Sequence, residues 1–577
     1  MVRTRGAAGA GAAGVVLRAG CALAGEAAVS GAGAGRPLRL WLALLVSALL
    51  VDLLLILPNH PGALRWPALR MVPLELPVLL LGMLALGPRA RPLAILASAA
   101  LTLMTALKLA DLSAYTAFGR GFDPLADMHL VPAAAHLLRG SAGLAGALGI
   151  GAALALLLGG AMVLLYRALR LWARCGSRLP RALRVAAGGI ALVFALLCAA
   201  EIRTALNGWQ GWRPPGSAFT ARLGAEHIRD FARARTALAE FERAAATDPW
   251  AGRDGLLSKL EGRPVVIVFV ESYGRAAFDN PLYAPRHLAT LQAGEAALAQ
   301  AGLAMRSGWL RSPVQGGQSW LAHATLAAGV EVSDQRRYRA LLASARQSLF
   351  TLATRAGYHT MAVAPAIVMD WPEGPAMGFQ EIRAAAELGY RGLPFNWVTM
   401  PDQYTLAEFD RIAADQGAPL MAEIALISSH APWTPVPQMV PWQAVGDGSI
   451  FDAEATSGPS PKEVWADPDR IRDHFGRSLD YALRNVLSWA ALPRAEPPLI
   501  LVLGDHQPAE FVAQAGGKDV PMHLIGPPEA LRLFEGWGWA AGLRPNPAQD
   551  ALPMRDVRDM FLRATSAAGP QMRADGS

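Results

Sequence analysis

The sequence has few cysteines and few charged residues for its length. It contains three cysteines in 577 residues, and none of them follows Cys198. The long C-terminal part therefore forms no internal disulfide and has no cysteine nucleophile. Charged residues make up 17% of the chain and hydrophobic residues 53%, a balance too apolar for an ordinary soluble enzyme. Part of the chain is therefore expected to lie in lipid.

Five apolar runs before residue 203 are candidates for membrane spans. Each is close to the roughly 20 residues that cross a hydrocarbon core, and together they cover residues 38–57, 72–87, 92–110, 144–166 and 185–202. The second run is the shortest and contains Glu75, and the third contains Lys108. Buried helices of a large soluble core are the alternative, but five such runs in succession favour a five-helix transmembrane bundle.

Arginines give these spans an orientation. Six of them lie between the fourth and fifth runs, namely Arg167, Arg170, Arg174, Arg178, Arg181 and Arg184. The positive-inside rule makes this loop cytoplasmic, so five spans place everything after residue 202 outside the cytoplasm. The distribution of charge agrees with this orientation. Residues 1–202 contain 18 basic and 7 acidic residues, whereas the rest of the chain contains 35 basic and 39 acidic residues. The net positive charge is thus a topology signal and gives no support to a nucleic-acid partner.

Composition divides the chain into five segments. The first is Ala/Gly-rich and is interpreted as a disordered cytoplasmic lead-in in preference to a cleaved signal peptide. The linker contains an amphipathic helix at 221–246, interpreted as packing on the following domain in preference to lying on the membrane surface. The segments are the lead-in (1–36), the five-span domain (37–202), an interfacial and helical linker (203–263), an extracytoplasmic domain (264–566) and a tail (567–577).

Within residues 264–566, short apolar runs alternate with helical stretches. This alternation predicts an α/β domain with a mainly parallel sheet flanked by helices. Strands are predicted at 265–270, 360–364, 422–427, 499–503 and 521–525, and helices at 286–301, 348–355, 406–415 and 469–490.

Acidic and histidine side chains follow two of the most apolar predicted strands. VVIVFV ends in Glu271, and LILVLG ends in Asp505 and His506. Ligands of open α/β sheets bind at the carboxyl ends of the strands, and these side chains suit a cation such as Mn²⁺ or Zn²⁺. A capping or salt-bridged Glu271 and a structural Asp-His turn are the alternatives. Their joint occurrence at one sheet edge favours a metal site.

The stretch VQGGQSWLAHAT contains a candidate nucleophile. Gly316 and Gly317 permit backbone conformations that direct amides at an anion, and Ser319 is expected at a helix start, where negative charge is favoured. A metal-coordinated serine hydroxyl can be ionised without a neighbouring base. The alternative is that Ser319 is only an N-cap.

A fourth motif is IALISSHAPW, in which a predicted strand leads to His430. This histidine is positioned to bind a substrate phosphate or to protonate a leaving group. A structural histidine is the competing interpretation.

Taken in order, these motifs resemble the alkaline phosphatase/sulfatase superfamily, and in particular its membrane-anchored branch of lipoteichoic acid synthases and phosphoethanolamine transferases. The resemblance implies that Glu271, Asp505 and His506 are metal ligands, that Ser319 is the nucleophile and a further ligand, and that His430 binds substrate. In the synthase branch the nucleophile is a threonine in a similar glycine-containing loop. The resemblance also makes 264–566 a sulfatase-like catalytic domain with an alkaline-phosphatase-like fold.

Some residues depart from the family pattern. Ser319 lacks the proline and arginine of the sulfatase signature, which argues against formylglycine chemistry. In APAIVMDWPEG, only Asp370 and Trp371 are counterparts of the substrate-contacting side chains, and Gly317 is the backbone candidate. His323 lies one helical turn after Ser319, where it either faces the site or is packed.

The resemblance implies a phosphotransferase of the bacterial inner membrane, multi-pass, with its catalytic domain on the periplasmic side. It would use one divalent cation, Mn²⁺ or alternatively Zn²⁺ or Mg²⁺. A membrane phospholipid would donate a phosphoglycerol or phosphoethanolamine group to a glycan or lipid through a phosphoserine. The alternatives are a phosphodiesterase, phosphatase or sulfatase-type hydrolase, and an inactive membrane-anchored assembly protein.

Overall fold

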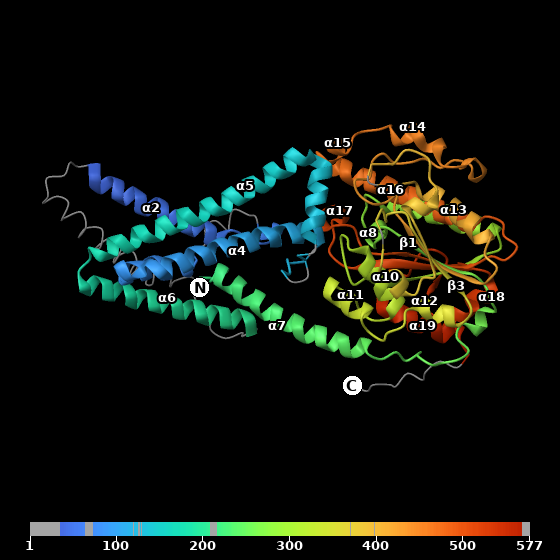
Figure 1. Cartoon of the computed structure of the whole chain (residues 1–577), viewed down its shortest axis with the longest axis horizontal. Coiled ribbons are helices and arrows are strands. Elements are labelled where there is room, and N and C mark those ends of the chain that lie inside the picture. Colours follow the sequence, from blue (N-terminus) through green and yellow to red (C-terminus); the bar gives the residue numbers. More distant parts are fainter. Residues whose placement is uncertain are drawn as a thin grey trace. The chain divides into compact units, whose positions relative to one another are not determined.

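The computed structural model describes residues 35–63, 73–118, 120–124, 127–128, 130–207, 216–369, 371–396 and 398–567. The proposed lead-in up to residue 34 and the tail from residue 568 lie outside these residues, as does Asp370. The chain divides into two compact units, and the boundary between them falls within helix α7 (Phe219–Ala245). Residues 116–119 are assigned to the second unit. Figure 1 shows the elements of both units in chain order.

The first unit consists of long apolar helices. They are α2 (Gly35–Ile56), α3 (Glu75–Leu86), α4 (Arg91–Phe118), α5 (Leu130–Ser177) and α6 (Arg181–Asn207). Four helical segments in the described residues are long and apolar enough to cross a membrane: Leu38–Ile56, Glu75–Ala117, Gly143–Ser177 and Arg181–Asn207. The second and third predicted spans thus fall in one helical stretch, and α3 alone, with 12 residues, is shorter than a typical span.

Glu75 and Lys108, the charged residues of the predicted second and third spans, both bind Thr220. The Lys108 ammonium donates hydrogen bonds to the carbonyls of Leu54 (3.1 Å) and Leu55 (2.8 Å) and to the Thr220 hydroxyl (2.8 Å). Glu75 accepts a hydrogen bond from the Thr220 backbone N–H (2.8 Å). A straight helix would separate positions 75 and 108 by about 50 Å. The chain therefore reverses between α3 and α4, where the 3₁₀ helix Gly87–Ala90 begins at a positive φ of 56°.

The second unit is built on one mixed sheet, with strand order β4-β3-β5-β1-β6-β7-β2-β8 and β9 beside β2. The strands are β1 (Val265–Val270), β2 (Ala304–Arg311), β3 (His359–Ala364), β4 (Glu381–Ala384), β5 (Leu420–Leu426), β6 (Leu499–Gly504), β7 (Asp519–Gly526), β8 (Ala540–Ala541) and β9 (Leu552–Pro553). All five predicted strands are present. The sheet is less parallel than predicted, because β7 runs antiparallel to both β6 and β2.

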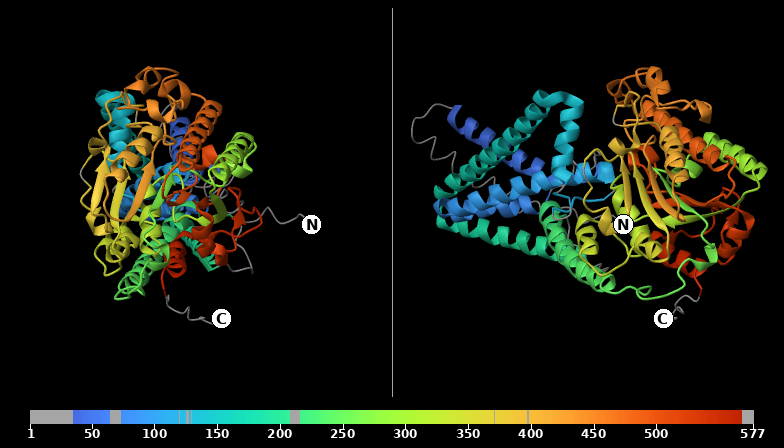
Figure 2. Two further views of the ribbon diagram at one scale, coloured as in Figure 1. Left: turned by 90° about the vertical axis from the view of Figure 1, so that its right-hand side faces the viewer. Right: turned by 45° about the vertical axis from the view of Figure 1, so that its right-hand side comes forward.

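Helices cover both faces of this sheet (Figure 2). Alternate residues of β1 enter two separate hydrophobic cores, because successive side chains of a strand point to opposite faces. Ile267 packs with α10 (Ser319–Ala328), α12 (Leu349–Arg355) and α19 (Val557–Thr565), whereas Val268 packs with α9 (Ala284–Gln300), α13 (Asp402–Ala414) and α16 (Pro468–Ala490). The shorter helices are α8 (Ala276–Asp279), α11 (Gln335–Leu342), α14 (Asp452–Ala455), α15 (Pro461–Trp465), α17 (Glu510–Ala513) and α18 (Pro528–Leu531).

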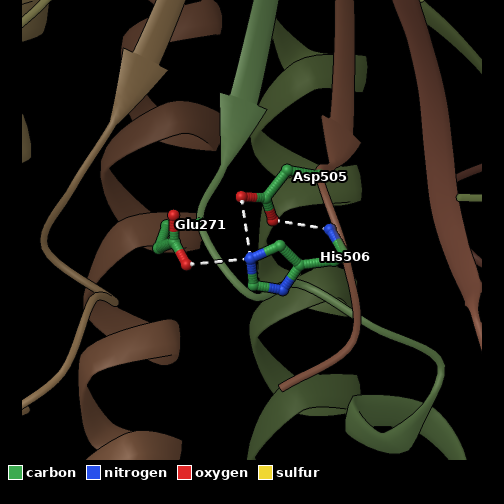
Figure 3. A group of neighbouring side chains, drawn as sticks. All are labelled: Glu271, Asp505 and His506. Atoms are coloured by element: carbon green, nitrogen blue, oxygen red, sulfur yellow. Dashed lines mark hydrogen bonds and ion pairs between the residues drawn. The ribbon is translucent and has the colours of Figure 1, made fainter. Parts of the chain in front are cut away.

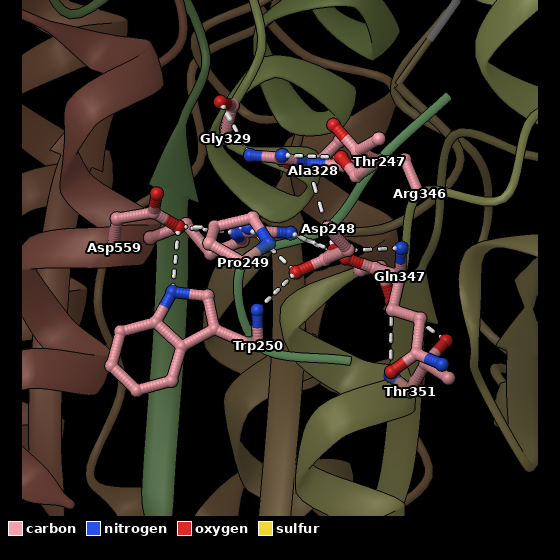
Figure 4. Close-up of polar contacts among 12 residues, drawn as sticks. Thr247, Asp248, Pro249, Trp250, Ala328, Gly329, Arg346, Gln347, Thr351 and Asp559 are labelled. Carbon is pink, nitrogen blue, oxygen red and sulfur yellow. Dashed lines mark hydrogen bonds and ion pairs between the residues drawn. The ribbon is translucent and has the colours of Figure 1, made fainter. Parts of the chain in front are cut away.

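A buried charge cluster fixes the chain just after α7 to the rest of the second unit (Figure 4). The fully buried guanidinium of Arg558 donates to Asp248 at 2.8 Å and to Asp559 at 2.8 Å. Arg346 donates to the carbonyls of Ala328 (2.8 Å) and Gly329 (3.0 Å) at the C-terminal end of α10. The cluster therefore connects the start of the second unit, its last helix and α10.

Replacing Arg558 by alanine is expected to lower the free energy of unfolding by about 3–5 kcal/mol, because the buried Asp248 carboxylate loses its main partner. Thermal unfolding of the detergent-solubilised chain measures the loss. Arg555→Ala is the matched control on the neighbouring turn, since Arg555 is 46% exposed and pairs with Glu331. Its effect should stay below about 1 kcal/mol, and equal effects of the two variants would contradict the importance of the buried cluster.

Candidate active site

The ends of two neighbouring strands bring the predicted metal ligands together. β1 and β6 are parallel and in register, with Val270 opposite Gly504. The next residues, Glu271 and Asp505, therefore leave the same edge of the sheet side by side. Glu271, Asp505 and His506 each offer one ligand atom, and these atoms all lie within 4.8 Å of one another. Figure 3 shows the three side chains directed toward one another.

Backbone contacts orient these ligands. One oxygen of Asp505 accepts hydrogen bonds from the N–H groups of Ser272 (2.8 Å) and His506 (2.7 Å), which leaves its other oxygen 3.5 Å from His506 Nε2. His506 Nδ1 lies 2.8 Å from the Gln507 carbonyl and donates to it. When the imidazole is neutral, it therefore presents the lone pair of Nε2 to the carboxylates, as a metal-binding histidine requires.

The electrostatics of this cluster are those of a cation site. Burial and the negative charge of Glu271 raise the pKa of Asp505 above its ordinary value. Burial alone would also raise the pKa of Glu271, but the charges of the His506 and His430 imidazoles hold it below its ordinary value. Two buried carboxylates this close repel each other unless positive charge lies between them. Two oxygens, one nitrogen and a nearby hydroxyl fit a divalent cation.

Ser319 is the first residue of α10, and its hydroxyl points at this cluster. Its Oγ donates a hydrogen bond to Glu271 Oε2 (3.0 Å) and lies 3.3 Å from His506 Nε2. The alternative interpretation of Ser319 as an N-cap is wrong. The N-cap is Gln318, which has a left-handed backbone (φ 67°), and no side chain caps this end. The Gly316–Gly317 pair, with φ values of 74° and 145°, makes the tight turn that brings Ser319 to Glu271.

The other predicted site residues lie at different distances from the cluster. His430 is the exposed residue of the turn after β5, and its Nδ1 donates to the Ala431 carbonyl (2.6 Å). It is near enough to lower the pKa of Glu271. Trp371 packs on Phe379, with ring centres 5.8 Å apart, at the rim of the hydrophobic core. No described contact joins it to Glu271, Asp505 or His506.

His323 is both packed and close to the site. Its ring stacks on Phe269 with centroids 3.8 Å apart, and its Nδ1 lies 2.9 Å from Glu423 on β5. Burial alone would lower the pKa of His323, but the carboxylate of Glu423 and the charges of Asp505 and Glu271 raise it. Sequence reasoning missed Glu423, although a glutamate within the apolar run LMAEIAL was a usable signal, because an unpaired charge is rarely buried.

His323→Leu is expected to lower the free energy of unfolding by about 3–5 kcal/mol, because it leaves the buried Glu423 carboxylate without its partner. The double variant His323→Leu/Glu423→Leu should recover most of this loss, since no charge is then left buried. Thermal unfolding of the purified chain in detergent compares the two. A double variant no more stable than the single one would show that the unpaired Glu423 carboxylate is not the cause of the loss.

Comparison with known proteins agrees with the fold and with the motifs. Residues 264–528 match the Sulfatase family model. Residues 264–528 therefore form a Sulfatase-family domain, which supports an enzyme of the alkaline phosphatase/sulfatase superfamily. No curated protein sequence matches the chain.

Solved structures with a similar arrangement of elements include a synthase and two transferases. Lipoteichoic acid synthase LtaP from Listeria monocytogenes is 12% identical, with 58% of this chain and 79% of that one covered at a TM-score of 0.36. The periplasmic domain of phosphoethanolamine transferase EptC from Campylobacter jejuni is 10% identical (52% and 87% covered, TM-score 0.34). Phosphoglycerol transferase GacH from Streptococcus pyogenes, solved with sn-glycerol-1-phosphate, is 11% identical (58% and 82% covered, TM-score 0.35).

Proposed function

We propose that this protein is a metal-dependent phosphotransferase that moves a phospholipid headgroup phosphate, phosphoglycerol or phosphoethanolamine, to an extracytoplasmic glycan or lipid. One observation carries the proposal. The hydroxyl of Ser319 is hydrogen-bonded to Glu271 and lies 3.3 Å from His506, so the proposed nucleophile lies against the proposed ligand set. The names of the similar transferases support the same substrate classes.

In the proposed first step, Ser319 Oγ attacks the phosphorus of the phospholipid in line. The Oγ–P bond forms, the bond from phosphorus to the diacylglycerol oxygen breaks, and that oxygen takes a proton from His430. In the second step a hydroxyl of the acceptor gives its proton to His430 and attacks the phosphoserine. The bond from phosphorus to the acceptor oxygen forms, the Oγ–P bond breaks, and Ser319 Oγ leaves as the alkoxide from which the first step starts. A divalent cation held by Glu271, Asp505, His506 and Ser319 would supply the positive charge that favours a serine alkoxide.

The remaining parts of the proposal concern substrate contacts, the cation and topology. Gly317, Asp370 and Trp371 are proposed to contact the substrate, and Mn²⁺ is the proposed cation, with Zn²⁺ or Mg²⁺ as alternatives. We further propose five membrane passes in a bacterial inner membrane, with the domain from residue 264 on the periplasmic side. The reversal between α3 and α4 supports the fifth pass, and the six arginines from Arg167 to Arg184 support the orientation.

The test is headgroup transfer by the full chain reconstituted in vesicles. Phosphatidylglycerol and phosphatidylethanolamine, each labelled in the headgroup, are supplied with and without a glycan acceptor in the presence of Mn²⁺. Labelled acceptor together with free diacylglycerol is the expected result. Release of labelled headgroup phosphate with no labelled acceptor would replace the transferase by a phosphodiesterase. Absence of both products would indicate an inactive assembly protein.

A further inference from the structure

The exposed large apolar side chains of the second unit lie in segments that leave one edge of the sheet. β1, β3, β4, β5 and β6 are parallel, and β2 runs in the same direction because β7 is antiparallel to both β6 and β2. All of the exposed large apolar residues from residue 237 to residue 567, among those described, follow the carboxyl ends of these strands. They are Leu282, Trp320, Val368, Met369, Leu393, Ile450 and Trp465.

The opposite edge has no such residues in the part of the second unit that the structure describes. The segments that enter β1, β3, β5 and β6 contribute no large apolar residue to the exposed set. Ser319 begins α10 at the apolar edge, and Trp320 is its immediate neighbour. The exposed apolar residues and the proposed nucleophile therefore follow the same edge of the sheet, and exposed apolar side chains there favour an interaction at this edge.

Val368 and Met369 are the most exposed members of this set. They are adjacent in the loop after β3 and are 71% and 80% exposed, so that Met369 is more exposed than any described large apolar side chain of the membrane helices. Trp320 and Trp465 have a different character. Their indole N–H groups donate to the Gln335 side chain and to the Pro432 carbonyl, while their rings are partly exposed. Such rings are favoured at the interface between water and lipid.

We propose that the carboxyl edge of this sheet binds the surface of a lipid bilayer, with Val368 and Met369 inserted among the acyl chains. The candidate membrane helices of the same chain favour a bilayer over a protein partner, because they tether the domain to a membrane. The inference rests on the proposed function in one respect, since it explains how a bilayer phospholipid reaches Ser319. Lipid contact at this edge is a separate property from headgroup transfer and is measured separately.

The first experiment measures the depth of single nitroxide labels in the full chain reconstituted in vesicles. Cys21, Cys175 and Cys198 are replaced by serine, and the label is attached after Met369→Cys or, as the matched control, Ala495→Cys. Ala495 is exposed in the segment that enters β6, at the opposite edge. The label at 369 should be more accessible to oxygen and less accessible to a water-soluble nickel complex than the label at 495. Equal accessibility at both positions would overturn the proposal. A label at 369 that is shielded from both reagents, in vesicles and in detergent, would indicate a protein contact and would also overturn it.

The second experiment compares two donors with the variant Val368→Ser/Met369→Ser. The apparent KM for a phospholipid donor in vesicles should rise about tenfold or more, since two apolar side chains no longer enter the bilayer. Turnover of the water-soluble diester bis(p-nitrophenyl) phosphate should stay unchanged. Loss of activity toward both donors would assign these residues to the substrate pocket and overturn the proposal. If the unmodified chain transfers nothing, the proposed function fails while the label depths still decide the lipid contact.

Discussion

Ser319→Ala is expected to lower turnover of a phosphodiester donor by about 10⁴-fold or more, because a reaction through a phosphoserine cannot proceed without the serine oxygen. The covalent adduct on the peptide that contains Ser319, visible by mass spectrometry after rapid acid quenching, should disappear with it. Ser319→Thr keeps a hydroxyl on the same Cβ and should therefore retain activity within about 100-fold of the unmodified chain.

Ser272→Ala is the matched control for the loss of a hydroxyl. Ser272 Oγ donates to the other oxygen of the same carboxylate, Glu271 Oε1, at 2.8 Å. The variant therefore removes an equivalent hydrogen bond without removing the proposed nucleophile, and turnover should fall about tenfold at most. If Ser272→Ala were as inactive as Ser319→Ala, or if the adduct persisted in Ser319→Ala, Ser319 would not be the nucleophile.

The parts of the sheet that the sequence predicts well are the fully buried central strands. VVIVFV and LILVLG are continuous apolar runs because both of their faces are covered. β2 is not predicted because AMRSGWLR is neither a continuous apolar run nor a regular alternation of polar and apolar residues. Its Ser307 and Arg306 contact partners from the far end of the chain. The antiparallel direction of β7 depends on pairing between distant segments, which periodicity within one run does not encode.

The candidate site shows the same division between local and distant information. The positions of Glu271 and Asp505 at strand ends follow from local sequence, and parallel pairing then explains why they meet. The conformation before Ser319 does not follow from local sequence, since the left-handed residue at the helix start is Gln318, a residue type that seldom adopts it. The apolar run around Glu423 predicts a strand but not the partner of this glutamate, because the partner is a histidine 100 positions away.

Asp505→Asn is expected to weaken divalent cation binding by about 100-fold or more. The substitution removes a negative charge and replaces one carboxylate oxygen by an amide nitrogen, which cannot bind a cation. The amide oxygen can still accept the hydrogen bonds from Ser272 and His506, so the local backbone should be preserved. The stability of the cation-free chain should not fall at pH 7.5. Burial raises the pKa of Asp505, which means that its ionised form is unfavourable in the folded state and that a neutral amide removes this penalty. Calorimetric titration with Mn²⁺ and the melting temperature with and without Mn²⁺ measure these effects.

Asp402→Asn separates loss of a ligand from loss of any buried aspartate. Asp402 is fully buried at the same edge and accepts hydrogen bonds from the N–H groups of Ile427 and Ser428, both at 2.9 Å. Burial raises its pKa to about 6, so it shares the burial and the raised pKa of Asp505 but belongs to no ligand cluster. Cation affinity should be unchanged in Asp402→Asn, and Mn²⁺ should raise its melting temperature as much as it does in the unmodified chain. At a thousandfold excess of Mn²⁺ over Kd, the free energy of unfolding should rise by about 4 kcal/mol in both. Equal loss of affinity in both variants would mean that the effect is general to this edge, and retained affinity in Asp505→Asn would remove Asp505 from the ligand set.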